Sequence, residues 1–313
     1  MPAQPRAPHL QWRVWWTLVQ RAAGAWVDDY VPSMGAALSY YTVFSLAPLL
    51  LIVVSIAGLV FGEEAARGEI FGELAGLLGA EAAMAVEDVL KGLNKPAQGM
   101  TGALIGVGVL LLGATSVFAE LQDALDRIWR APVREKTRGI WPLLRARLLS
   151  FGLILGIAFL LMVSLVTGAV IAALGKWWGT FFGGWDTLLQ LVNLAVGFGL
   201  TTLVFAMIYK MMPRVRVQWL DVWIGALVTA VLFTAGKYLI GLYIGSTGVA
   251  SGYGAAGSLI VVFIWVYFSA QIFLMGAEFT WIYARMFGSM KHLEVETPEL
   301  TVKPAEIPSR NDT

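Results

Sequence analysis

Long runs without a charged residue constrain the fold of this sequence more than any other feature. A helix needs about 20 mostly apolar residues to cross a bilayer core about 30 Å thick. The sequence has several such runs, with 58% hydrophobic and only 14% charged residues. Soluble domains have roughly 45–50% apolar and about 25% charged residues. The sequence therefore predicts an all-α fold, a polytopic membrane helix bundle.

Six transmembrane helices are predicted within a domain that spans residues 31–284. The last two come from one apolar stretch, which is too long for a single span. Its middle, IGSTGVASGYGAAGS at 244–258, is rich in Gly and Ser and predicts a break. The predicted spans lie near 36–61, 100–120, 148–174, 187–209, 220–243 and 257–281.

The basic residues predict the orientation of the bundle, because cytoplasmic loops carry an excess of Lys and Arg. With both termini in the cytoplasm, 17 basic residues fall in the inner segments and four in the outer ones, while Lys237 lies within a span. Both N- and C-termini are therefore expected on the cytoplasmic side.

Three segments outside the spans have distinct patterns. Residues 1–30 include an amphipathic helix, which either lies in the cytoplasmic interface or packs on the inner ends of the bundle. Segment 62–99 alternates acids with apolar residues at helical spacing, with a break near Gly79, and is expected to cover the outer face. The tail, 285–313, is polar and is expected to be cytoplasmic and disordered.

Ionisable and amide side chains within or near the spans are the candidate transport residues, because such groups are costly in a membrane. The structural alternatives are an interfacial lysine, acids paired with basic loop ends, and amides that bond neighbouring helices. The candidates are Lys237, Gln271, Glu278, Glu120, Asp123, Asn193 and Gln190.

The glycine-dense segment Gly236–Gly257 gives a backbone whose polar groups lipid cannot satisfy. It includes Lys237 and Tyr253, and we expect it to line an outward-facing polar cavity; a hairpin tip in solvent is the alternative. Glycine pairs four residues apart, such as Gly241/Gly245, predict close helix crossings.

A basic cluster follows the second predicted span. An anionic lipid headgroup would find a site there, although plain positive-inside topology explains the same charges. The candidate lipid contacts are Arg127, Arg130, Arg145 and Arg147.

The sequence offers no catalytic or metal site. It has no cysteine, and its two histidines, His9 and His292, lie in the polar tails away from any acid cluster. Hydrolase, nucleotide-binding and metal-ligand motifs are missing. With a net charge of only +1, it lacks the basic character of a nucleic-acid binder. We expect no enzyme activity, no cofactor, no metal and no nucleic-acid partner.

Three ordered blocks resemble the signature blocks of the YihY/virulence factor BrkB family of bacterial inner-membrane proteins. They are AALSYYTVFSLAPLLL (36–51), GATSVFAELQDALDRIWR (113–130) and SGYGAAGSLIVVFIWVYFSAQIFLMGAEFTWIYA (251–284). The resemblance implies six transmembrane helices and a multi-pass protein of the bacterial inner membrane. It also implies an association with serum resistance and envelope lipid export, and carries no established catalytic residues.

These observations favour a transporter or envelope lipid translocator, whose partners are membrane lipids and a lipid or small-molecule substrate. The alternative is a non-transporting membrane scaffold. A ribonuclease label attached to the family is not supported, because a metal-dependent nuclease needs a His/Asp cluster to hold its ion.

Overall fold

The computed structural model describes residues 12–61, 68, 70–72, 74–75, 78–93, 100–132, 185–215, 217–248, 252–253 and 256–291. All regular elements in these ranges are helices. The helices are α1 (Trp12–Asp28), α2 (Val31–Phe61), α4 (Ala80–Leu93), α5 (Met100–Ile128), α7 (Trp185–Met211), α8 (Trp219–Thr247) and α10 (Gly257–Met286).

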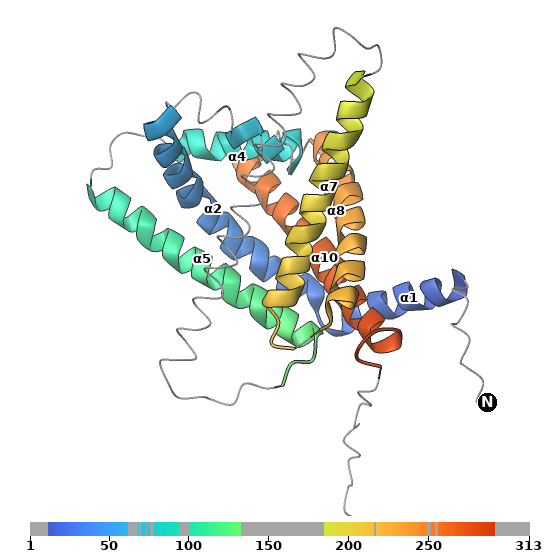
Figure 1. Ribbon diagram of the computed structural model, residues 1–313. Coiled ribbons are helices and arrows are strands. Elements are labelled where there is room, and N and C mark those ends of the chain that lie inside the picture. Colours follow the sequence, from blue (N-terminus) through green and yellow to red (C-terminus); the bar gives the residue numbers. More distant parts are fainter. Residues whose placement is uncertain are drawn as a thin grey trace, which may run out of the picture.

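Helix α10 lies at the centre of the bundle. It packs against α1, α2, α4, α5 and α8, while α5 packs mainly on α2 and α7 mainly on α8. Figure 1 shows α5 and α2 on one side of α10, and α7 and α8 on the other. The α1–α2 junction, the C-termini of α5, α7 and α10, and the N-terminus of α8 meet at one end, here termed the basic end.

The predicted spans agree with long helices wherever the structure describes them. Of these helices, α7 (from Leu191), α8 and α10 are long and apolar enough to cross a membrane. The described part of the chain is therefore all-helical and includes three helices with the length and composition of membrane spans. The predicted span 148–174 lies outside the described residues, so six spans and cytoplasmic termini stay predictions.

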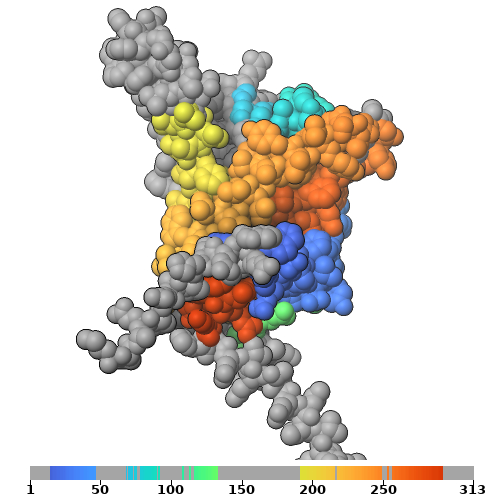
Figure 2. All heavy atoms as spheres, turned by 90° about the vertical axis from the view of Figure 1, so that its right-hand side faces the viewer, coloured from blue at the N-terminus to red at the C-terminus, as the bar shows by residue number. Residues whose placement is uncertain are grey.

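An exposed apolar stripe follows α8 at steps of three and four residues, as expected for a helix face turned to lipid. Figure 2 faces this side of the molecule, with α8 in orange. The exposed side chains of the stripe are Leu220, Trp223, Leu227, Val231, Tyr238 and Leu242.

A close helix crossing joins α8 and α10 through two reciprocal glycine–threonine pairs. A Cβ added to Gly225 would overlap the Thr280 side chain, and one added to Gly276 would overlap Thr229. Each threonine donates a hydrogen bond to the glycine carbonyl four residues earlier, Thr229 at 2.8 Å and Thr280 at 2.6 Å. The hydroxyls are thus satisfied while the two backbones approach closely.

The predicted glycine pair Gly241/Gly245 does not make such a crossing. A Cβ added at either position would meet nothing within 4 Å. The α8 helix also continues through Gly245 and ends at Thr247, with Gly248 at φ 61° and ψ 23° after it. The predicted break at 244–258 therefore begins about four residues later than expected, because the left-handed turn falls at Gly248.

Helix α4 covers the end of the bundle opposite the basic end (Figure 1). Gly79, at φ +88°, separates it from the preceding residues, which agrees with the predicted break. Ala82, Ala85 and Val86 of α4 are buried in one core cluster with Ile240 of α8 and Val261 of α10. The indole N–H of Trp265 donates to the Leu78 carbonyl oxygen at 2.7 Å, which anchors the start of this cap.

Helix α1 packs on α10 through a small cluster at the basic end. Leu18 and Ala22 are buried beside Phe279, and the Trp15 ring stacks on the Phe279 ring with centroids 6.3 Å apart. Trp16 and Val19 stay exposed. An amphipathic helix therefore lies against the bundle with part of its apolar face uncovered.

Candidate functional site

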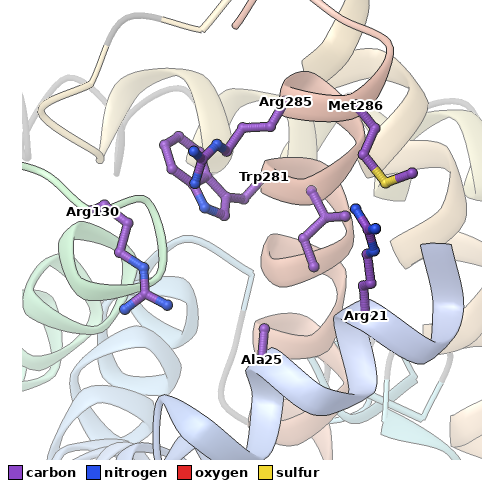
Figure 3. Close-up of a pocket in the computed structure, with 7 residues that line it drawn as sticks. Arg21, Ala25, Arg130, Trp281, Arg285 and Met286 are labelled. Atoms are coloured by element: carbon purple, nitrogen blue, oxygen red, sulfur yellow. The ribbon is translucent and has the colours of Figure 1, made fainter. Parts of the chain in front are cut away.

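A cavity of about 450 Å³ lies at the basic end between α1, α10 and Arg130, which follows α5. Three arginines line it, Arg21 from α1, Arg130 after α5, and Arg285 from α10 (Figure 3). The rest of the lining is apolar: Ala25, Trp281, Ile282 and Met286. We term this space the arginine cavity.

The three guanidinium groups have different partners. Arg285 Cζ lies 5.4 Å from the centroid of the Trp281 ring, a cation–π contact on the cavity wall (Figure 3). Arg130 Nη1 lies 2.8 Å from Asp29 Oδ1. Within the described residues, Arg21 and Arg285 have no carboxylate partner, so the cavity has an excess of positive charge.

Two strained turns bring Arg130 and Asp29 together. Tyr30, which joins α1 to α2, has φ 57°, and Arg130, which ends α5, has φ 51°. They are the non-glycine residues with positive φ in the described part of the chain. Such a backbone costs on the order of 1–3 kcal/mol at each residue and persists where the surroundings fix it. The Arg127 guanidinium, 5.4 Å from the Tyr30 ring centroid, links the two turns a second time.

Glu278 is buried against this junction. It is 0% exposed, and neither carboxylate oxygen has a hydrogen-bond donor. The charged groups that act on it are Asp29, which is within hydrogen-bonding reach, then Arg130 and Asp28. Asp29 is also buried, and its Oδ2 has no donor either. Two buried carboxyl groups therefore lie together, and Arg130 bonds one of them, Asp29.

Further polar contacts hold the basic end together. Asp126 of α5 accepts the Arg214 backbone N–H at 2.9 Å, and its other oxygen lies 3.3 Å from Arg214 Nε. Asp221 of α8 accepts two hydrogen bonds from Ser289, at 2.8 and 2.7 Å. These contacts fix the loop after α7 and the segment after α10 on their neighbours.

A second, apolar cavity of about 350 Å³ lies between α7 and α8. Phe198 and Thr202 line it from α7, and Trp223, Ile224 and Leu227 from α8. Thr202 donates its hydroxyl proton to the Phe198 carbonyl oxygen at 2.8 Å. This hydroxyl proton is therefore already used within α7, and the lining gives a ligand little polar contact.

The predicted transport residues do not form one site. Gln271 is buried and donates weakly to the Val31 and Pro32 carbonyl oxygens, at 3.5 and 3.4 Å, which is the interhelical role given as the alternative. Asn193 and Tyr253 are exposed, and Lys237 is half-buried on α8. Neither Lys237 nor Tyr253 lines either of the two cavities.

The predicted acids and lipid contacts at the basic end are only partly gathered. Glu278 and Arg130 both lie at the junction with Asp29, whereas Glu120 is half-buried and Asp123 exposed on α5. The acid of α5 that pairs with a basic loop is Asp126. Arg127 lies over Tyr30 outside the cavity lining. Gln190, Arg145 and Arg147 lie outside the residues whose side chains are described.

Sequence reasoning missed Arg21, Arg285 and Asp29 as site residues. Arg21 and Arg285 looked like ordinary basic flanks, and Asp29 lies between two predicted elements. A signal was available in the spacing on α10, because Glu278 and Arg285 are seven residues apart and therefore share one helix face. In the part of the chain described, no group of three potential metal ligands occurs.

Comparison with known proteins gives a consistent family assignment. A family model described as virulence factor BrkB matches residues 22–298. The UPF0761 membrane protein of Pseudomonas paraeruginosa is 30% identical over 82% of this chain and 60% of its own length. That of Psychromonas ingrahamii is 28% identical over 81% of this chain and 82% of its own length. The chain thus spans about 60% of the Pseudomonas relative. No solved structure matches.

Proposed function

The chain belongs to the BrkB family of membrane proteins, and from this premise we propose that it translocates anionic envelope lipids, with the arginine cavity as the headgroup site. The single observation that carries the proposal is the grouping of Arg21, Arg130 and Arg285 around one cavity. Arginine suits a phosphodiester because its planar group donates two parallel hydrogen bonds to one phosphate.

The apolar part of the lining supports a lipid rather than a free anion. Trp281, Ile282 and Met286 stand beside the arginines, so a ligand with a charged head and an apolar body would contact both. The basic end also carries Arg127, Lys210 and Arg214. We place this end at the cytoplasmic leaflet, whose anionic lipids attract basic segments.

A reconstitution experiment tests the proposal. Purified protein in liposomes is assayed for translocation of fluorescent phosphatidylglycerol, and compared with Arg21→Gln/Arg285→Gln. Loss of two charge-assisted contacts, at about 1.5–3 kcal/mol each, should weaken headgroup binding at least tenfold. Lys291→Gln removes an exposed charge at the same end and serves as the control. Competition with soluble inorganic phosphate separates a lipid site from a general anion site.

The outcomes distinguish translocation from the scaffold alternative. If wild-type protein moves no lipid, or if the double variant moves it as fast as wild type, the proposed function is wrong. A protein that binds neither lipid nor phosphate but retains partner proteins in the membrane would favour the scaffold.

A further inference from the structure

The carboxyl groups of Asp29 and Glu278 lie together in the protein interior with too few donors for two negative charges. Glu278 is fully buried on α10, Asp29 is buried at the α1–α2 junction, and the two are within hydrogen-bonding reach. Three of their four oxygens, both of Glu278 and Oδ2 of Asp29, have no donor. A buried ionised carboxylate without a partner is strongly unfavourable and takes up a proton instead.

Arg130 is the cation that faces both carboxyl groups. Arg130 bonds Asp29 Oδ1, and this contact satisfies the fourth oxygen. The other charged groups that face Glu278 are Asp28, which adds negative charge, and Arg130 itself. One proton held between a Glu278 oxygen and Asp29 Oδ2 would satisfy two of these three oxygens and leave a single negative charge opposite Arg130.

The same arginine belongs to the arginine cavity. Arg130 therefore faces the carboxyl pair on one side and the cavity on the other. With both carboxyls ionised, two negative charges would offset the three arginines and hold Arg130 on Asp29. With one proton bound, the cavity keeps a larger excess of positive charge, so an anion binds more tightly.

We infer that Asp29 and Glu278 form a shared-proton site, and that its proton strengthens the binding of an anionic lipid headgroup in the arginine cavity through Arg130. Linkage makes the effect mutual, because a ligand that binds better to the protonated form also favours protonation. The lipid part of this inference rests on the proposed function. It gives a membrane protein with a proton site next to its substrate site, which is the arrangement needed to couple transport to a proton gradient.

Infrared spectroscopy tests the shared proton without any lipid. Wild-type protein in nanodiscs at neutral pH should show the C=O stretch of a protonated carboxyl group, and Glu278→Gln should lose it. Glutamine keeps the volume of Glu278 and can donate to Asp29 as the protonated acid does, so this variant should fold. Asp29→Asn provides a second variant, in which the band shifts because its hydrogen-bond partner changes. A spectrum unchanged by both variants would overturn the inference.

Vesicle binding tests the coupling. Binding to vesicles that contain phosphatidylglycerol, whose phosphodiester stays ionised near neutral pH, should weaken about tenfold in wild type as the pH rises and the pair loses its proton. Glu278→Gln, which cannot lose it, should bind tightly at every pH. A His9→Asn/His292→Asn variant, which removes the histidines of the two tails, should keep the wild-type dependence.

The two tests separate failure of the inference from failure of the proposed function. Tight binding in wild type with no pH dependence, or a dependence that persists in Glu278→Gln, would overturn the coupling. If no anionic vesicle binds at any pH, the lipid function fails, and the infrared band alone decides whether the shared proton exists.

Discussion

At the scale of single residues, the α8–α10 crossing depends on positions where no side-chain carbon fits. Gly225 and Gly276 each face a threonine of the partner helix, and the two threonines bond their own helices. Tyr209 of α7 extends the contact, since its hydroxyl donates to the Phe273 carbonyl oxygen at 2.7 Å and lies 3.1 Å from Thr229 Oγ1.

Adding one methyl group at this crossing should be costly. Gly225→Ala places a Cβ on the Thr280 side chain, and overpacking of this kind costs about 1–3 kcal/mol. Thermal unfolding in detergent should show the loss. Gly245→Ala, on the same helix but with open space around it, should be neutral or stabilising by up to about 1 kcal/mol. Equal effects of the two changes would argue against the crossing.

Removing the Tyr209 hydroxyl should have a smaller effect. Tyr209→Phe keeps the ring, which packs on Phe205 and Phe273, but loses both hydrogen bonds. We expect a loss of about 1 kcal/mol in the free energy of unfolding. Tyr238→Phe, at a side chain that is 75% exposed, should change nothing measurable. If Tyr209→Phe leaves the free energy of unfolding unchanged, the two hydrogen bonds of this hydroxyl add no net stability to the folded state.

The sequence could not identify these residues in advance. With 34 glycines in the chain, spacing alone does not say which ones face a neighbouring helix. Gly241/Gly245 has the expected spacing but open surroundings, while Gly225 and Gly276 lie on two different helices and become a pair only in three dimensions. Glu278 could be identified because a charged residue within an apolar span is unusual. Arg21 and Asp29 lie before the first predicted span, where charged residues are common.

At the scale of the elements, α4 shows how a short amphipathic helix is fixed to the bundle. Acidic side chains interleaved with apolar ones predicted a helical cover with a break near Gly79, and the structure agrees on both points. What the sequence could not show is the anchor, because the Trp265 indole reaches Leu78 from a residue 187 positions away.

Loss of this anchor should loosen the cap and spare the bundle. Trp265→Phe keeps an aromatic ring beside Phe233 but removes the donor to the Leu78 carbonyl oxygen. Hydrogen exchange should accelerate in α4 and remain unchanged in the C-terminal half of α10, after residue 270. Trp223→Phe, at an exposed tryptophan of α8, is the matched control. Exchange that rises equally in both helices would show that α4 and α10 open as one unit.

At the scale of the whole molecule, the absence of cysteine makes the predicted topology directly testable. Met84 of α4 and Lys291 after α10 are exposed and lie towards opposite ends of the bundle. In intact spheroplasts, an impermeant maleimide should label Met84→Cys, and should label Lys291→Cys only after lysis. The reverse pattern would place the termini outside, and with them the arginine cavity.

Segment lengths predicted the long helices of the described part, because a bilayer allows few alternatives to helices about 20 residues or longer. Helices α2, α5, α7, α8 and α10 all fall on predicted spans. The order in which they pack could not be predicted in the same way, since every span is apolar. It depends on local shape at positions such as Gly113, which faces Ser45 between α5 and α2.

The central place of α10 has a consequence for biogenesis. It contacts α1, α2, α4, α5 and α8, and reaches α7 through the Phe273 carbonyl, yet it is the last described helix to leave the ribosome. Until then the Tyr209 hydroxyl lacks the Phe273 carbonyl oxygen that it donates to, and the packed pairs α2–α5 and α7–α8 lack the helix between them. Completion of the bundle is therefore a late event in synthesis, and a nascent chain cut short before α10 exposes to quality-control proteases polar groups that the full fold buries, such as the Tyr209 hydroxyl.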